Sequence, residues 1–100
     1  MQIIDQHREE IEALCRKHSV QKLYAFGSVL SEKFSDLSDV DLLVEFRGVD
    51  LSRYADNYFE LKFALEETFN HPVDLIEAKA LRNPFFQQSV EASRQLLYAA

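Results

Sequence analysis

With 100 residues, the chain is long enough for one compact domain and hardly for two. Its composition is 47% hydrophobic with only two glycines and two prolines, which indicates a folded core and argues against disorder. Seventeen acidic against eleven basic side chains give a net charge of −6, with no cluster of lysine and arginine, so nucleic acid is disfavoured as the main partner.

Cysteine usage and the N-terminal sequence indicate a compartment. The one cysteine, Cys15, permits no intrachain disulfide, which suits a reducing environment. Residues 1–7 lack the charged start and apolar run of a secretory leader, and no apolar run approaches the length of a membrane span. We therefore expect a cytoplasmic protein that has no membrane segment.

The first half of the chain predicts a helix, a strand and a second strand. Apolar residues recur at helical spacing over 4–18, which predicts an amphipathic helix. An aromatic-rich strand over 22–26 follows, then a short helix over 29–33 and a loop over 34–38. The clearest strand covers 40–46. Its alternation places Val40, Leu42, Val44 and Phe46 on one face, and Asp39, Asp41, Leu43 and Glu45 on the other.

The second half predicts two helices around a third strand. A long helix covers 51–69, with Asp50 or Ser52 as its cap, and a strand covers 73–76. Asn83 followed by proline predicts the start of a last helix that continues to about residue 98. This helix is expected to bury Phe85, Phe86, Val90, Leu96 and Leu97. The aromatic residues of the long helix are expected in the core, although some could form an exposed patch for a partner: Tyr54, Tyr58, Phe59, Phe63 and Phe69.

These elements predict one α/β (α+β) domain over residues 1–100, with a small mixed sheet of three or slightly more strands packed against helices. The connection between the first two strands is too short for a crossover helix, so that pair is expected to be antiparallel. A long helix joins the second strand to the third, so that pair is expected to be parallel. A domain of this size would gain burial from a partner or from homo-oligomerisation.

Three aspartates are the candidate metal ligands. Asp39 and Asp41 are two residues apart on a strand, so their side chains share a face with Cα atoms roughly 6–7 Å apart. Asp74 lies between Val73 and Leu75, and it joins the other two if its strand pairs with theirs. Carboxylates gathered on one face repel one another and favour a cation between them. The alternative for Asp74 is a surface acid on an edge strand.

Gly27 and Ser28 are the candidate phosphate-binding residues. Glycine allows the backbone to approach a phosphate closely, and the N–H groups at a helix start bind anions without basic side chains. The alternative is that Gly27 ends a strand and Ser28 caps a helix. Phosphate beside metal-binding carboxylates would describe a site for a nucleoside triphosphate.

The pair Gly27-Ser28, the gap over 29–38 and the run Asp39-Val40-Asp41 together resemble the signature of the DNA polymerase beta-like nucleotidyltransferase superfamily. The short chain and the run over 38–44 resemble its minimal nucleotidyltransferase (MNT) branch. The resemblance implies that Asp39, Asp41 and Asp74 coordinate two Mg²⁺ ions, that Asp74 also helps to deprotonate the attacking hydroxyl, and that Gly27 and Ser28 hold the triphosphate.

The resemblance also implies a reaction and a partner. A nucleoside monophosphate would pass from NTP, with ATP as the expected donor, to a hydroxyl on a partner protein. Minimal members are often antitoxins encoded with a helical HEPN-type toxin, which makes such a protein the expected partner.

One departure from the family pattern leaves alternatives open. Many minimal members carry arginines after the glycine–serine pair, whereas the only base in the gap over 29–38 is Lys33. This departure favours a rival hypothesis, a non-catalytic antitoxin with a relict nucleotide site, and the intact aspartates oppose it. A plain α/β interaction domain without nucleotide becomes the better hypothesis if Asp74 lies far from Asp39.

Overall fold

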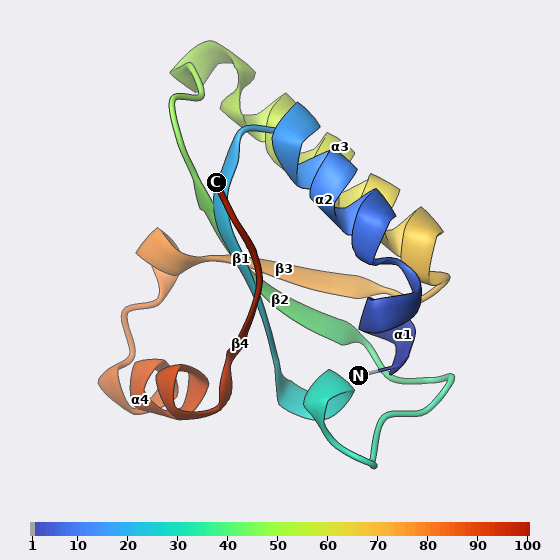
Figure 1. The fold of residues 1–100 in the computed structure, drawn as a ribbon. Helices are drawn as coiled ribbons and strands as arrows, with labels where there is room; N and C mark the ends of the chain where they lie inside the picture. The colour runs from blue at the N-terminus through green and yellow to red at the C-terminus, as the bar shows by residue number, and fades with distance from the viewer. Residues whose placement is uncertain (1) are drawn as a thin grey trace.

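The computed structural model describes residues 2–100 (Figure 1). Helices and strands follow one another in this order: α1 (Gln2–Gln6), α2 (Arg8–Lys17), β1 (Val20–Phe26), the 3₁₀ turn η1 (Gly27–Leu30), β2 (Val40–Phe46), α3 (Leu51–Phe69), β3 (Val73–Glu77), the 3₁₀ turn η2 (Ala78–Ala80), α4 (Pro84–Ser93) and β4 (Gln95–Ala99). No helix among these residues is long and apolar enough to cross a bilayer.

Four strands form one mixed sheet in the order β3-β2-β1-β4. The β1–β2 pair is antiparallel and the β2–β3 pair is parallel, which confirms both predictions. The α+β class with a small mixed sheet is therefore confirmed, with β2 in an inner position and β3 at one edge.

The predicted last helix is wrong in its second half. Its start is correct, because the side chain of Asn83 accepts hydrogen bonds from the backbone N–H groups of Phe85 and Phe86. However, the helix ends at Ser93 and the chain continues as β4, antiparallel to β1. The reason is long-range: the outer edge of β1 would otherwise leave its backbone groups unpaired, and β4 satisfies them.

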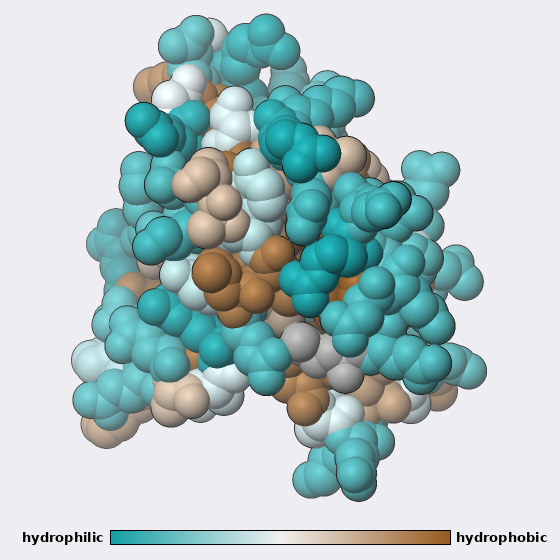
Figure 2. All heavy atoms as spheres, viewed as in Figure 1, coloured by the Kyte–Doolittle hydropathy of each residue, from teal (hydrophilic) through white to brown (hydrophobic). Residues whose placement is uncertain are grey.

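This change alters which apolar residues are buried. Val90 and Leu97 are buried as predicted. Burial of Phe85 and Leu96 is a wrong prediction, because they are 83% and 53% exposed, and Phe86 is also exposed. Figure 2 shows hydrophobic residues gathered in the middle of one face, over β4, with hydrophilic residues around them.

The two faces of the sheet are covered differently. Helices α2 and α3 cover one face and enclose the main core, which includes Val40, Leu42 and Val44 (Figure 1). A smaller cluster on the other face joins Leu43 to Phe26 and to Val90 of α4. The predicted alternation along β2 is thus confirmed.

Several boundaries differ from those predicted. The N-terminal helix is two helices, with a break at His7. Strand β1 starts at Val20, and the turn after it covers Gly27–Leu30 where a helix over 29–33 was expected. Helix α3 has the predicted bounds, and Asp50 is its N-terminal cap residue, but its side chain makes no capping hydrogen bond.

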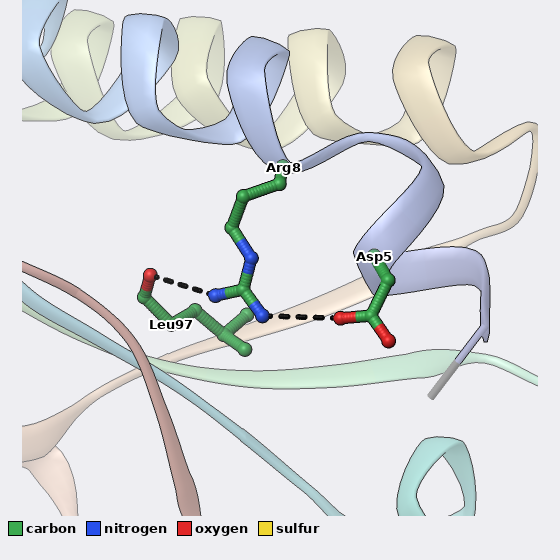
Figure 3. Close-up of polar contacts among 3 residues, drawn as sticks. All are labelled: Asp5, Arg8 and Leu97. Carbon is green, nitrogen blue, oxygen red and sulfur yellow. Dashed lines mark hydrogen bonds and ion pairs between the residues drawn. The ribbon is translucent and has the colours of Figure 1, made fainter.

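Arg8 ties the break between α1 and α2 to the edge of the sheet (Figure 3). Its guanidinium donates to the backbone carbonyl of Leu97 at 3.2 Å and to Asp5 Oδ1 at 3.1 Å. The first contact spans 89 positions of sequence and joins the start of α2 to β4. The side chain therefore pairs with a carbonyl of an edge strand.

Candidate active site

The end of β1 and the start of β2 meet at Gly27. Phe26 is the register partner of Asp41, so the chain leaves the sheet beside this aspartate. Gly27 has a φ of +75°, a conformation that side chains disfavour. A Cβ atom at this position would lie 3.3 Å from Asp41 Cγ and closer still to Oδ2. Glycine therefore gives the carboxylate of Asp41 its space.

Asp74 lies beside Asp41. The two residues are register partners in the parallel β2–β3 pair, and partners on adjacent strands point to the same face of a sheet. That face is opposite the main core, because the flanking residues Val73 and Leu75 are buried in it. The sequence could not decide this register, since a shift of one residue would have turned Asp74 to the other face.

Asp39 is positioned by the loop that precedes β2. The backbone N–H of Val40 donates to the carbonyl of Pro72 at 2.9 Å, which joins the starts of β2 and β3. The His71 ring contacts the carbonyl of Ser38 through Nδ1 at 3.0 Å and packs against Phe34. These contacts hold the segment before Asp39, whose side chain is exposed and close enough for its charge to raise the pKa of Asp41.

The charges of these acids act on one another. Burial raises the pKa of Asp41, and the negative charges of Asp74 and Asp39 raise it further. A pKa raised by burial and by neighbouring acids is common among the carboxyl groups of functional sites. The third reading of the sequence, an interaction domain with distant aspartates, required Asp74 to lie apart, and the structure brings it close.

The three aspartates can be compared with the ligands that a divalent cation needs. Among residues 2–100, no three His, Cys, Asp or Glu side chains are close enough as placed to hold one ion. However, Mg²⁺ is usually bound by one or two carboxylates together with substrate phosphates and waters, so a closed protein cage is not required. Two carboxylates in direct register on one face, with Asp39 close enough for its charge to act on Asp41, fit this mode. Their role as ligands stays a prediction.

The residues around Gly27 supply few positive charges. Ser28 is half-buried, and its carbonyl accepts hydrogen bonds from the backbone N–H and the hydroxyl of Ser31 at 2.9 and 3.1 Å. These bonds fix the turn after Gly27. Lys33, the one base in the gap, is exposed.

Sequence reasoning missed the contribution of the C-terminal segment to this face. Phe86 of α4 packs edge-on against Phe26, with 6.0 Å between ring centroids. The guanidinium of Arg94 lies over the ring of Tyr24 at 4.2 Å and lines a hollow of about 140 Å³ with Leu43 and Val90. The sequence pattern predicts a helix that continues to about residue 98, and such a helix gives Arg94 no place on the sheet.

Comparison with known proteins agrees with this geometry. A model of the family described as polymerase beta, nucleotidyltransferase, matches residues 9–100. The chain belongs to this nucleotidyltransferase family. Two proteins of Methanocaldococcus jannaschii, provisionally named protein adenylyltransferases, are each 32% identical to this nucleotidyltransferase over 90 residues. The alignments cover 82% and 90% of this chain and 89% of each relative.

Solved structures share the fold. A structure described as a minimal nucleotidyltransferase superposes with a TM-score of 0.75 at 29% identity and covers 92% of this chain and 90% of that one. A toxin–antitoxin structure with AMP-PNP superposes with a TM-score of 0.71 at 23% identity, covering 93% and 73% of the two chains. The predicted family and its minimal branch are thereby confirmed.

Proposed function

We propose that this nucleotidyltransferase moves a nucleoside monophosphate from Mg²⁺-bound NTP, with ATP as the donor, to a hydroxyl on a partner protein. The observation that carries the proposal is the register pairing of Asp41 with Asp74 beside Gly27. This pairing joins two acids from different strands on one face, next to the exposed Gly27, with which the turn η1 begins. Asp39 directly precedes β2, and its charge raises the pKa of Asp41.

The proposed roles follow from these positions. Asp39, Asp41 and Asp74 would hold two Mg²⁺ ions, which would neutralise the phosphate charge and orient the reacting oxygens. Gly27 and Ser28 would hold the triphosphate. Asp74 would accept the proton of the attacking hydroxyl. The hydroxyl oxygen then bonds to the α-phosphorus, the bond from that phosphorus to the bridging oxygen breaks, and pyrophosphate leaves with the electron pair.

The nature of the acceptor is supported by related proteins. The archaeal relatives carry names of protein adenylyltransferases. A further structure of the same fold, with a TM-score of 0.65 and 21% identity, is described as a tri-AMPylated HEPN toxin of Shewanella oneidensis in complex with an MNT antitoxin. We propose that the acceptor here is likewise a HEPN-type protein and that the chain acts as its antitoxin in the cytoplasm. We further propose that residues 1–100 form a single minimal nucleotidyltransferase domain.

A second candidate function has its own observation. Lys33 is the only base in the segment over 29–38, and it is exposed, so the region beside the aspartates has little positive charge for a triphosphate. This favours an antitoxin that neutralises its partner by occlusion and keeps a relict site.

ATP binding separates the two functions. Calorimetric titration of the folded protein with ATP should show binding that requires Mg²⁺, and ATP labelled on its α-phosphate should transfer the label to a HEPN-type protein, whereas ATP labelled on the γ-phosphate should not. The variant Asp41→Asn should lose both the Mg²⁺-dependent ATP binding and the transfer of the α-phosphate label. Asp36→Asn is the matched control, because Asp36 is an exposed acid in the loop before the site. Absence of Mg²⁺-dependent binding in folded wild-type protein favours occlusion.

A further inference from the structure

Helix α3 carries two aromatic side chains on its outer surface. Phe59 and Phe63 are 48% and 57% exposed, and their rings stack with centroids 6.0 Å apart and planes 27° apart. Residues four apart on a helix are neighbours, so the two rings form one continuous apolar patch with the exposed Ala55 one turn earlier. Adjacent exposed aromatic rings mark an interaction surface more often than scattered single ones do.

Phe59 and Phe63 are not part of the buried core. The inner face of α3 supplies Leu61, Leu65 and Phe69, all of which are buried. The outer rings are nevertheless held in place. Tyr58 packs edge-on against Phe59 at 5.0 Å, and its hydroxyl donates to the backbone carbonyl of Leu75 in β3. An aromatic patch fixed in advance loses little conformational freedom when a partner binds.

Charge around the patch indicates the chemistry of that partner. Asp56, Glu60 and Glu67 are exposed along one side of Phe59 and Phe63. In the described part of the chain, the ion pairs are His7–Glu10 and Asp5–Arg8, so these three acids have no basic partner. Two cations lie on the same helix: Lys62, which is over the Phe63 ring at 5.9 Å, and the exposed Arg53, which precedes Asp56 by about one turn and makes no ion pair with it. The patch is thus apolar with an acidic border.

We propose that this surface, formed by Ala55, Asp56, Phe59, Glu60, Phe63 and Glu67 and called here the α3 face, docks a helix of another protein that presents apolar side chains bordered by lysine or arginine. A basic border would complement the three acids, and opposed charges favour both the encounter and the register of an interface. A second copy of this chain would instead oppose acid to acid, and nucleic acid would be repelled. The inference does not depend on nucleotidyl transfer.

The position of the α3 face separates it from the candidate active site. Helix α3 covers the sheet face that encloses the main core (Figure 1). Asp41 and Asp74 are register partners, and their flanking residues are buried in that core, so the two aspartates lie on the opposite face. A helix bound to the α3 face therefore leaves the aspartates open. A partner could therefore contact the α3 face while the aspartates are occupied by a ligand.

Two synthetic helical peptides test the proposal. Both carry the same leucine stripe, and one has lysine along one side of it while the other has glutamate at the same positions. Titrated into isotopically labelled protein, the lysine peptide should shift the amide signals of residues 55–67, and the glutamate peptide should bind roughly tenfold more weakly or not at all. Phe59→Ser with Phe63→Ser should weaken the lysine peptide by roughly tenfold or more while the protein stays folded.

Charge reversal keeps the test independent of folding. Asp56→Lys with Glu60→Lys should invert the preference between the peptides, and Leu96→Ser, an exposed apolar residue on β4, should leave binding unchanged. The proposal is overturned if the lysine peptide causes no shift or shifts signals elsewhere, or if both peptides bind equally. It is also overturned if sedimentation shows that the wild type is a dimer and that the Phe59→Ser, Phe63→Ser variant is a monomer. The α3 face would then bind a second copy of the chain.

Discussion

The carboxylate of Asp41 occupies the space in which a side chain at position 27 would lie. A Cβ atom built on Gly27 would be 3.3 Å from Asp41 Cγ and in steric conflict with Oδ2. The two residues are therefore linked: the absence of a side chain at one position permits the placement of the carboxylate at the other. This contact joins the two halves of the sequence signature, the glycine–serine pair and the aspartate pair.

Replacement of Gly27 should damage the site more than the fold. Gly27→Ala forces a side chain into a φ of +75°, which costs roughly 1–2 kcal/mol of stability, and it also displaces the Asp41 carboxylate. We expect a moderate loss in the free energy of unfolding, measured by denaturant titration, together with a loss of Mg²⁺-dependent ATP binding. Gly48→Ala is the matched control, because Gly48 has a φ of +68° and no atom within 4 Å of a built Cβ. A similar loss of binding in both variants would refute the steric link.

The repulsion between the three aspartates should lower the stability of the protein when no cation is bound. Asp41→Asn removes one of three mutually repelling charges, so its melting temperature should equal or exceed that of the wild type. Mg²⁺ with ATP at ten times the dissociation constant should stabilise the wild type by about 1.4 kcal/mol, or roughly 6–11 °C, and leave the variant unchanged. Differential scanning fluorimetry measures both. A variant that melts well below the wild type would show that Asp41 is a structural residue.

The contact of Arg8 with β4 should govern the stability of that edge. Arg8→Ala removes the hydrogen bond to the Leu97 carbonyl and should cost about 1–2 kcal/mol, with faster amide hydrogen exchange in residues 95–99 than in residues 20–26. Arg16→Ala serves as the control, since Arg16 is an exposed residue of the same helix α2. Equal exchange in the two variants would show that β4 is held by β1 alone.

Tyr54 should make stability fall at high pH. Burial raises the pKa of Tyr54 to about 12, and its hydrogen bond to Glu77 Oε2 at 2.9 Å adds to the effect. A folded pKa above the unfolded value of about 10 gives a contribution that is fully present below pH 10 and is lost as the pH rises through about 12. Denaturant unfolding at a series of pH values should show this loss in the wild type and less of it in Tyr54→Phe. Identical dependence of stability on pH in the wild type and in Tyr54→Phe would mean that Tyr54 has the same pKa in the folded and unfolded states.

Local patterns were sufficient for the segments that position the site. The bounds and faces of strand 40–46 follow from alternation, which places four apolar residues on the side of the main core and Asp41 away from it. Helix 51–69 was predicted with its bounds because Asn70 and Pro72 end it. In contrast, the sequence left Phe59 and Phe63 open between the core and an exposed patch for a partner, and the structure exposes both.

The sequence by itself determined the family signature, the orientation of Asp41 and the pairing directions of the first three strands, because period, loop length and motif spacing are local properties. The tertiary structure alone decided that residues 95–99 are a strand and that Asp74 is in register with Asp41. Both depend on backbone hydrogen bonds between distant segments. The open edge of β1 made a strand more favourable than a continued helix, and the β2–β3 register fixed which face of the sheet Asp74 occupies.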